Sequence, residues 1–252
     1  MLDIENTKAE YSHEAIVDKY ISYVDDIGLW QSEKIVFNKY LKHHDKILDL
    51  GCGTGRTTFG LYETGFRDVI GLDLSEEMIS AAKKIAQNKG TQIPYVAGNA
   101  CDLSFEADYF DTVIFSFNGI MTIPTNKMRQ KAFDEIYRVL KPGGTFIFTT
   151  HDIDNPQFTD YWNDERNKWK NGEQDKRLLE YGDLIFSKPD DYGDAVSFVH
   201  VPMVGEVEMH LKTSGFNLIY NELRSDICEE NPKVLDFSVE CKFWIARKND
   251  VR

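Results

Sequence analysis

Between residues 46 and 150 the chain alternates short apolar runs with longer stretches whose apolar residues recur at helical spacing. The apolar runs predict strands at about 46–50, 68–73, 95–97, 112–117 and 145–150. The helical spacing predicts helices at about 55–63, 75–89 and 125–140. Regular alternation of this kind is typical of a parallel sheet with helices on both faces. The sequence therefore predicts a doubly wound α/β fold.

Two more helices are expected before the first strand. Ile16, Val17, Tyr20, Ile21 and Val24 have helical spacing, which predicts one helix ending near 26–28. A second should cover about 31–41. Together they form an N-terminal helical extension at 11–41, whereas 1–10 are expected to be frayed.

After residue 150 the simple alternation stops. Residues 152–203 contain an aromatic-rich segment, then a strand or hairpin at 177–187, a turn at 188–191 and a strand near 196–201. An insertion here would lie above the carboxyl ends of the strands, where open α/β sheets bind ligands. We expect 152–203 to be an inserted substrate lid; an oligomer contact is the alternative. A helix at 204–214 and strands at 216–223 and 238–247 complete the chain.

The sequence around Ile47–Arg56 predicts a ligand-binding turn. An apolar strand is followed by Gly51, Gly53 and Gly55, and a helix begins after them. Glycines allow unusual dihedral angles and let a ligand lie against the backbone. Twenty residues after Gly53, Asp73 closes the second strand, where nucleoside-binding folds place an acid on the ribose hydroxyls. The alternative for Asp73 is to cap the helix that begins near Ser75.

Composition limits the remaining classes. The 252 residues suit a single domain at 1–252, and 42% apolar residues are enough for a core. No apolar run approaches the ~18 residues of a membrane span, and the N-terminus lacks the pattern of a signal peptide. Four cysteines without paired spacing suggest reduced thiols and a cytoplasmic protein. A net charge of −13 disfavours nucleic acid as a partner.

The glycine turn and Gly71-Leu72-Asp73-Leu74-Ser75 resemble the class I S-adenosylmethionine (SAM)-dependent methyltransferases. Segments 97–103, 110–118 and 140–146 match the family in order and spacing. The resemblance is strong over about 40–150 and weak elsewhere. It implies a seven-stranded, mostly parallel sheet in the order 3-2-1-4-5-7-6 with the last strand antiparallel. It also implies that the N-terminal extension folds over the SAM pocket, where Tyr11, Tyr20 and Trp30 either contact ligands or only pack.

The family's contacts with the cofactor can be carried over residue by residue. The resemblance implies cofactor-binding roles for Asp49, Gly51, Cys52, Gly53, Arg56, Asp73, Leu74, Met78, Asn99, Ala100, Cys101, Ser116 and Phe117. Asp49 would favour the α-ammonium group of SAM or, alternatively, make an internal hydrogen bond that shapes the loop. Arg56 would meet the carboxylate or remain solvated. Asn99 departs from the family, which usually has an acid there, but its carbonyl can still accept from adenine.

The methyl acceptor is expected beyond the ends of strands four and five. Ser116, Phe117 and Asn118 should border the reactive methyl group. His151 follows strand five and would be either a general base or a residue that orients the lid through a backbone hydrogen bond. The other five histidines show no metal-binding spacing, so we expect no metal.

These features predict a SAM-dependent methyltransferase that methylates an O or N atom of a small molecule and releases S-adenosylhomocysteine. The chain would be a monomer or homodimer that does not bind membranes. Alternatives are a methyltransferase for protein or tRNA, or a non-catalytic SAM-binding module. An NAD-dependent oxidoreductase shares the glycines and the acid, but Gly51–Arg56 lacks the third glycine of GxGxxG.

Overall fold

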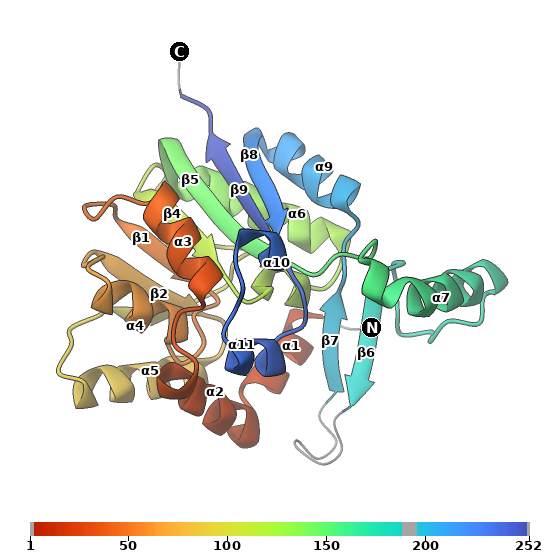
Figure 1. Ribbon diagram of the computed structural model, residues 1–252, viewed down its shortest axis with the longest axis horizontal. Helices are drawn as coiled ribbons and strands as arrows, with labels where there is room; N and C mark the ends of the chain where they lie inside the picture. Colours follow the sequence, from red (N-terminus) through yellow and green to blue (C-terminus); the bar gives the residue numbers. More distant parts are fainter. Residues whose placement is uncertain (1–2, 188–195, 251–252) are drawn as a thin grey trace.

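The computed structural model describes residues 3–187 and 196–250, and a seven-stranded sheet forms its centre (Figure 1). The strands of this sheet are β1 (Ile47–Leu50), β2 (Val69–Asp73), β3 (Tyr95–Ala97), β4 (Phe110–Phe115), β5 (Leu140–Thr150), β8 (Phe216–Leu223) and β9 (Lys242–Lys248). They lie in the order β3-β2-β1-β4-β5-β9-β8. β9 is antiparallel to both of its neighbours, β5 and β8, and the five strands from β3 to β5 pair in parallel. The predicted sheet order is therefore confirmed.

Helices cover both faces of the sheet (Figure 1). One face carries α3 (Gln31–Tyr40), α4 (Arg56–Glu63) and α5 (Glu76–Asn88), and the other carries α6 (Asn126–Val139) and α9 (Val204–Ser214). Successive side chains of a strand point to opposite faces. In β5, accordingly, Phe146 and Phe148 pack on one face and Ile147 on the other. This explains why the central strands are apolar at nearly every position.

The parallel register brings three strand ends together. Asp49 and Leu50 of β1 pair with Gly71 and Leu72 of β2, and Asp73 at the end of β2 pairs with Ala97. The glycine turn, Asp73 and the loop after β3 therefore meet at one edge of the sheet. That edge is where open parallel sheets bind ligands.

The N-terminus differs from the prediction. Residues that were expected to be frayed form α1 (Ile4–Tyr11), which precedes α2 (Glu14–Asp26). The carboxylate of Asp3 accepts the backbone N–H groups of Glu5 and Asn6, and the Asn6 side chain accepts the Asp3 N–H in return. This capping box stabilises the first turn of a short polar helix. The prediction of a frayed segment was therefore wrong.

The insertion after β5 is partly helical. Its aromatic segment forms η2 (Pro156–Phe158) and α7 (Thr159–Asn171), and its later part forms a hairpin of β6 (Asp183–Ser187) and β7 (Val196–His200). The predicted turn at 188–191 lies outside the described residues. Figure 1 shows α7 extending away from the sheet. In the described ranges no helix is both long and apolar enough to cross a membrane.

Between β8 and β9 the chain carries two short helices that were not predicted, α10 (Arg224–Ile227) and α11 (Pro232–Phe237). The last strand consequently begins later than the predicted residue 238. Glu230 fixes this segment to the start of α3, because its carboxylate accepts the backbone N–H groups of Gln31 and Ser32. An anion at a helix N-terminus satisfies donors that the helix itself leaves unpaired.

Candidate active site

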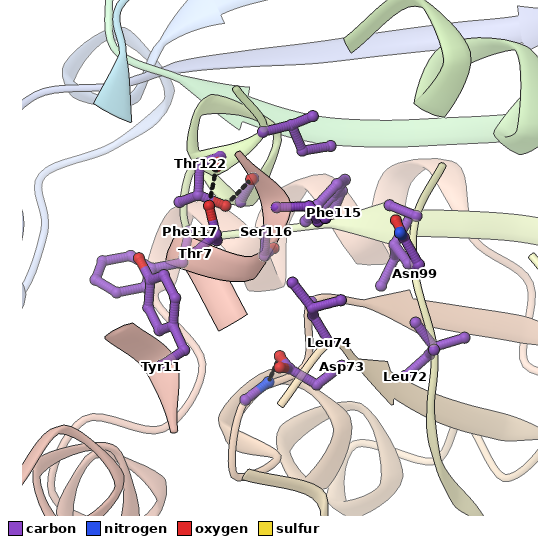
Figure 2. A pocket seen from close by; sticks show the side chains of 18 of the residues that line it. Thr7, Tyr11, Leu72, Asp73, Leu74, Asn99, Phe115, Ser116, Phe117 and Thr122 are labelled. Carbon is purple, nitrogen blue, oxygen red and sulfur yellow. Dashed lines mark hydrogen bonds between the residues drawn. The ribbon is translucent and has the colours of Figure 1, made fainter. Parts of the chain in front are cut away.

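A hollow of about 740 Å³, open to solvent, lies at the carboxyl ends of β1, β2 and β4 (Figure 2). The predicted site residues that line it are Gly51, Gly53, Asp73, Leu74, Asn99, Ala100, Ser116 and Phe117. A smaller adjoining hollow shares Gly51, Ser116 and Phe117 with the first and adds Cys52 and Arg56. Asp49, Met78 and Cys101 line neither hollow.

The glycine turn is shaped so that only glycine fits. Gly51, Gly53 and Gly55 have φ angles of 64°, 54° and 99°, which other residues rarely adopt. A Cβ atom on Gly51 would lie 2.6 Å from the Phe115 ring. Gly51 and Gly53 therefore bring backbone to the lining of the hollow, as a cofactor cradle requires.

Asp73 joins the turn to the next helix. Its Oδ2 accepts the Gly53 N–H (2.8 Å) and its Oδ1 accepts the Ser75 N–H (2.9 Å). Ser75 in turn caps α5 by accepting the Met78 N–H. Burial raises the pKa of Asp73, and these backbone hydrogen bonds oppose that effect. Each carboxylate oxygen keeps a further lone pair, so Asp73 can shape the turn and still accept from a ribose diol.

Asp49 makes an internal hydrogen bond, which was the alternative to its predicted contact with the α-ammonium group. It is 1% exposed, and Thr58 Oγ1 donates to its Oδ2 at 2.5 Å. Burial raises the pKa of Asp49 to about 7, although Thr58 and Arg56 lower it. The contact with the α-ammonium group stays a prediction.

Arg56 is buried and paired, so the solvated alternative was wrong. Its two terminal nitrogens donate to the two carboxylate oxygens of Glu33, both at 2.7 Å, and one also donates to the Gly28 carbonyl. Its guanidinium lies 5.3 Å from the centre of the Trp30 ring. A bidentate pair of this kind holds α3 against α4. Both terminal nitrogens of Arg56 thus already have partners within the protein. Its contact with the cofactor carboxylate stays a prediction.

Asn99 lies in the lining of the larger hollow, and its side-chain oxygen accepts the Cys101 N–H at 2.8 Å. Its second lone pair remains for an adenine amino group. Leu74 and Ala100 lie beside it in the lining. Met78 and Cys101 are buried behind the lining, and Cys101 Sγ donates to the Met128 carbonyl.

The N-terminal helices cover the hollow. Ile4, Thr7 and Tyr11 of α1 and Tyr20 of α2 line it, and Thr7 Oγ1 donates to the Thr122 carbonyl at 3.1 Å (Figure 2). Trp30, in contrast, is fully buried in the core. No described residue of 152–203 lines either hollow, so the lid role of that insertion stays a prediction.

A second cover comes from α11, which the sequence reasoning missed. Phe237 stacks on Phe117 with ring centres 4.6 Å apart and an interplanar angle of 12°. Tyr23 meets Phe237 edge to face at 4.3 Å. The local signal for this helix is Asn231 followed by Pro232, a cap and a first-turn proline. Nothing local indicates that its last residue reaches the end of β4.

His151 lies at the end of β5 but does not line the hollow. Its Nδ1 is 2.9 Å from the Glu240 carbonyl oxygen, and its Nε2 is 3.3 Å from Asn118 Nδ2. Burial lowers the pKa of His151, so the ring is neutral at pH 7. Both ring nitrogens therefore have partners within the protein.

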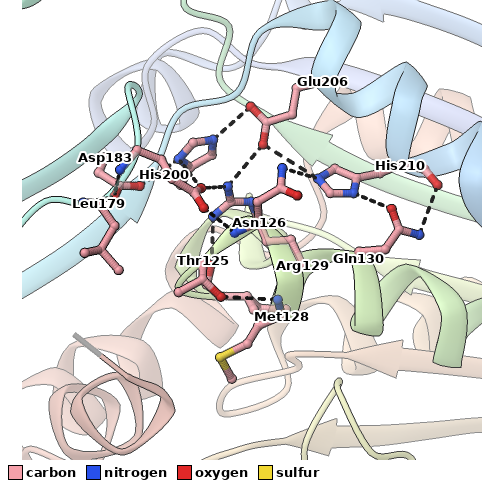
Figure 3. Close-up of polar contacts among 12 residues, drawn as sticks. Thr125, Asn126, Met128, Arg129, Gln130, Leu179, Asp183, His200, Glu206 and His210 are labelled. Carbon is pink, nitrogen blue, oxygen red and sulfur yellow. Dashed lines mark hydrogen bonds and ion pairs between the residues drawn. The ribbon is translucent and has the colours of Figure 1, made fainter. Parts of the chain in front are cut away.

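A separate polar cluster ties the β6–β7 hairpin to the sheet's helices (Figure 3). His200 on β7 lies between Asp183 Oδ1 (2.8 Å) and Glu206 Oε2 (3.0 Å), and Arg129 pairs with Glu206 and Glu180. Glu180, Asp183 and His200 lie close enough together to hold a cation. Because Arg129 already supplies a positive charge there, a metal ion would have to displace it.

The geometry defines a class of protein. A seven-stranded sheet with its last strand antiparallel carries a glycine turn after β1 and an acid that closes β2. Residues 47–144 match the methyltransferase domain family. This part of the chain is a methyltransferase domain, and the sheet has the fold of the class I SAM-dependent methyltransferases.

Several known proteins are similar to this chain. A demethylmenaquinone methyltransferase of Lactococcus lactis is 43% identical over 104 residues, which span only 40% of each chain. A putative methyltransferase of Bacillus subtilis is 28% identical over 221 residues, covering 83% of this chain and 86% of the relative. A SAM-dependent methyltransferase structure from Methanosarcina mazei has the same fold, with a TM-score of 0.69 and 22% identity over 89% of this chain and 100% of that one.

Proposed function

We propose that this protein transfers a methyl group from SAM to an O or N atom of a small-molecule acceptor. The observation that carries the proposal is the hydrogen bond between the Gly53 N–H and Asp73, because it fixes the glycine turn against the strand-end acid. Together they form a glycine-lined cradle with one carboxylate at its rim. That arrangement suits a nucleoside whose ribose donates two hydroxyl groups.

The residues of the hollow fit SAM from end to end. Asp73 would accept from the ribose, Leu74 and Ala100 would flank the adenine, and Gly51 and Gly53 would approach the amino-acid portion. SAM supplies a methyl group on a positively charged sulfur. The protein's contribution is to orient the acceptor and exclude water, and positioning alone is worth roughly 7–11 kcal/mol of barrier. The covers from α1 and α11 supply the walls for that enclosure.

A small acceptor is supported by three observations. The hollow is roofed by α1. The net charge of −13 disfavours tRNA. The demethylmenaquinone methyltransferase of L. lactis is named for a small acceptor. A protein or tRNA acceptor and a non-catalytic SAM-binding module are the alternatives.

The test begins with isothermal titration of S-adenosylhomocysteine. Asp73→Ala should weaken binding about 10- to 100-fold, the usual effect of losing hydrogen bonds to a charged group. Asp68→Ala is the matched control, because Asp68 is exposed just before β2, at the opposite end from Asp73. Methyl-labelled SAM with fractionated metabolites then identifies the acceptor. No binding by the unaltered protein would refute the proposal.

A further inference from the structure

Two hydrogen bonds define the protonation state of His151. Its Nδ1 lies 2.9 Å from the Glu240 carbonyl oxygen, which can only accept, so Nδ1 carries the proton. With the ring neutral, Nε2 then carries the lone pair. The backbone N–H of His151 donates to Met121 Sδ at 3.1 Å, which holds the residue from its other side. His151 is thus a fixed hydrogen-bond acceptor.

The side-chain amide nitrogen of Asn118 donates to His151, and the side-chain carbonyl of Asn118 has no partner among the described residues. Its Nδ2 donates to His151 Nε2 at 3.3 Å, which turns Oδ1 the opposite way. Oδ1 is shielded from solvent and has no hydrogen-bond partner within residues 3–187 and 196–250. An unsatisfied buried acceptor costs about 1–3 kcal/mol. Such groups are uncommon in folded proteins, and a donor from outside the chain is one way to satisfy them.

The backbone is strained at Asn118, which is not itself among the residues that line the hollow. Phe117 and Asn118 have consecutive left-handed φ angles of 51° and 61°, each costing about 1–3 kcal/mol. The Asn118 N–H donates to Thr149 Oγ1 at 2.9 Å, which holds the strained turn in place. The two neighbours of Asn118 in sequence, Phe117 and Gly119, both line the hollow. Strain that is held this firmly at a ligand site is typical of functional residues.

We propose that Asn118 Oδ1 binds the O–H or N–H group of the methyl acceptor, and that His151 acts only through Asn118 as a positioning residue. His151 fixes the amide so that its oxygen, and not its nitrogen, faces the acceptor. The acceptor class is therefore a small molecule with a hydroxyl or amine donor at or next to the methylated atom. This assignment rests on the proposed methyltransferase function, and it replaces the general-base role that the sequence offered for His151.

The geometry is tested without any acceptor, by NMR of protein labelled with ¹⁵N-histidine. The expected result is a neutral His151 with its proton on Nδ1, both with and without S-adenosylhomocysteine. Asn118→Gly should shift the Nε2 signal toward that of a free lone pair. Glycine is the suitable replacement because position 118 needs a positive φ angle. An imidazolium ring, an Nε2–H tautomer or an unchanged Nε2 signal would overturn the proposal.

The role is tested by kinetics with the acceptor that the labelled-SAM screen identifies. Asn118→Gly should lower kcat/KM for the acceptor about 10- to 100-fold while binding S-adenosylhomocysteine normally. His151→Gln keeps an acceptor for the Asn118 amide but cannot serve as a base near neutral pH, so it should retain more activity than His151→Ala. None of these three variants should change the shape of the pH profile of kcat/KM.

The outcomes separate this assignment from the proposed function. If His151→Gln were as inactive as His151→Ala and both lost an acidic limb of the pH profile, His151 would be a base and the assignment wrong. Normal kinetics in Asn118→Gly would also overturn it while leaving the methyltransferase function intact. A screen that finds no acceptor, or a wild-type protein that binds no S-adenosylhomocysteine, would remove both.

Discussion

At the scale of single residues, Asp49 should make cofactor binding depend on pH. Its pKa of about 7 means that the carboxylate is largely neutral at pH 6 and ionised at pH 8. An ionised Asp49 would attract the α-ammonium group of SAM, so affinity should increase over that interval. Titration calorimetry at pH 6, 7 and 8 measures this. Asp49→Asn, which still accepts from Thr58, should give a nearly flat profile; an equally steep one would exclude Asp49.

The same pKa has a consequence for stability. Between its unfolded value of about 3.9 and about 7, the folded protein binds this proton and the unfolded chain does not. The contribution of Asp49 to stability therefore falls as pH rises through that window. Asp49→Asn removes this dependence of stability on pH. The melting temperature of the variant minus that of the wild type should therefore increase from pH 5 to pH 8.

Residues with a local signature were predictable. Gly51, Gly53 and Asp73 stand out because their types and spacing follow from the turn itself, and the structure brings them together. The pairing of Arg56 with Glu33 was not predictable, because the two lie on different helices and no pattern within either one indicates the partner. The same limit applies to Asn118, whose unpaired carbonyl depends on the position of His151.

At the scale of elements, α1 should control how fast the cofactor leaves. The helix contributes Ile4, Thr7 and Tyr11 to the hollow, and one hydrogen bond from Thr7 fixes it to the Thr122 carbonyl. Deleting residues 1–12 should speed dissociation of S-adenosylhomocysteine about tenfold, equivalent to losing roughly 1.4 kcal/mol. Stopped-flow fluorescence measures the rate, and Thr7→Val should give a smaller increase. An unchanged rate after the deletion would show that α1 is not a cover.

The β6–β7 hairpin should be held by a protonated His200. Burial lowers the pKa of His200, but hydrogen bonds to Asp183 and Glu206 outweigh this and leave that pKa raised. Arg129, Glu180 and His210 surround the same site. Because the folded-state pKa is above about 6.5, this pairing stabilises fully below that pH and is lost as pH rises through the folded-state value.

His200→Gln should therefore lose on the order of 3 kcal/mol at pH 6, as buried ion pairs do when one partner is removed. The difference from wild type should shrink at pH 9. Urea unfolding at both values measures it, with the exposed His13→Gln as the matched control. A difference that grows with pH would contradict a charged His200.

Elements were predictable where their pattern is local and repeated. The strands and helices between 46 and 150 carry clear periodicity, and the structure confirms them. The helix α1 was missed because it is mostly polar, and α11 because it has only six residues and packs against distant segments. Their caps, Asp3 and Asn231, were visible in the sequence. A cap shows that a helix can begin, but it does not show what the helix will cover.

At the scale of the whole molecule, the hollow draws on segments from α1 to the turn after β4, and Phe237 of α11 lines the smaller hollow that adjoins it. Ligand binding and folding should therefore be coupled across the chain. If residues 1–252 form a single domain, thermal unfolding should show one transition. S-adenosylhomocysteine at a hundred times its Kd should stabilise the fold by about 2.7 kcal/mol. For a chain of this length that corresponds to a rise in Tm of about 5–11 °C.

Differential scanning calorimetry at several ligand concentrations measures this coupling. Asp73→Ala should unfold in one transition as well, but its Tm should respond only at far higher ligand concentrations, because the variant loses affinity and not the sheet. Two transitions, of which the ligand moves only one, would mean that the insertion at 152–203 or the N-terminal extension unfolds separately from the cofactor domain. In that case the covers would be independent units docked on the sheet, and the enclosure of the acceptor would depend on their docking.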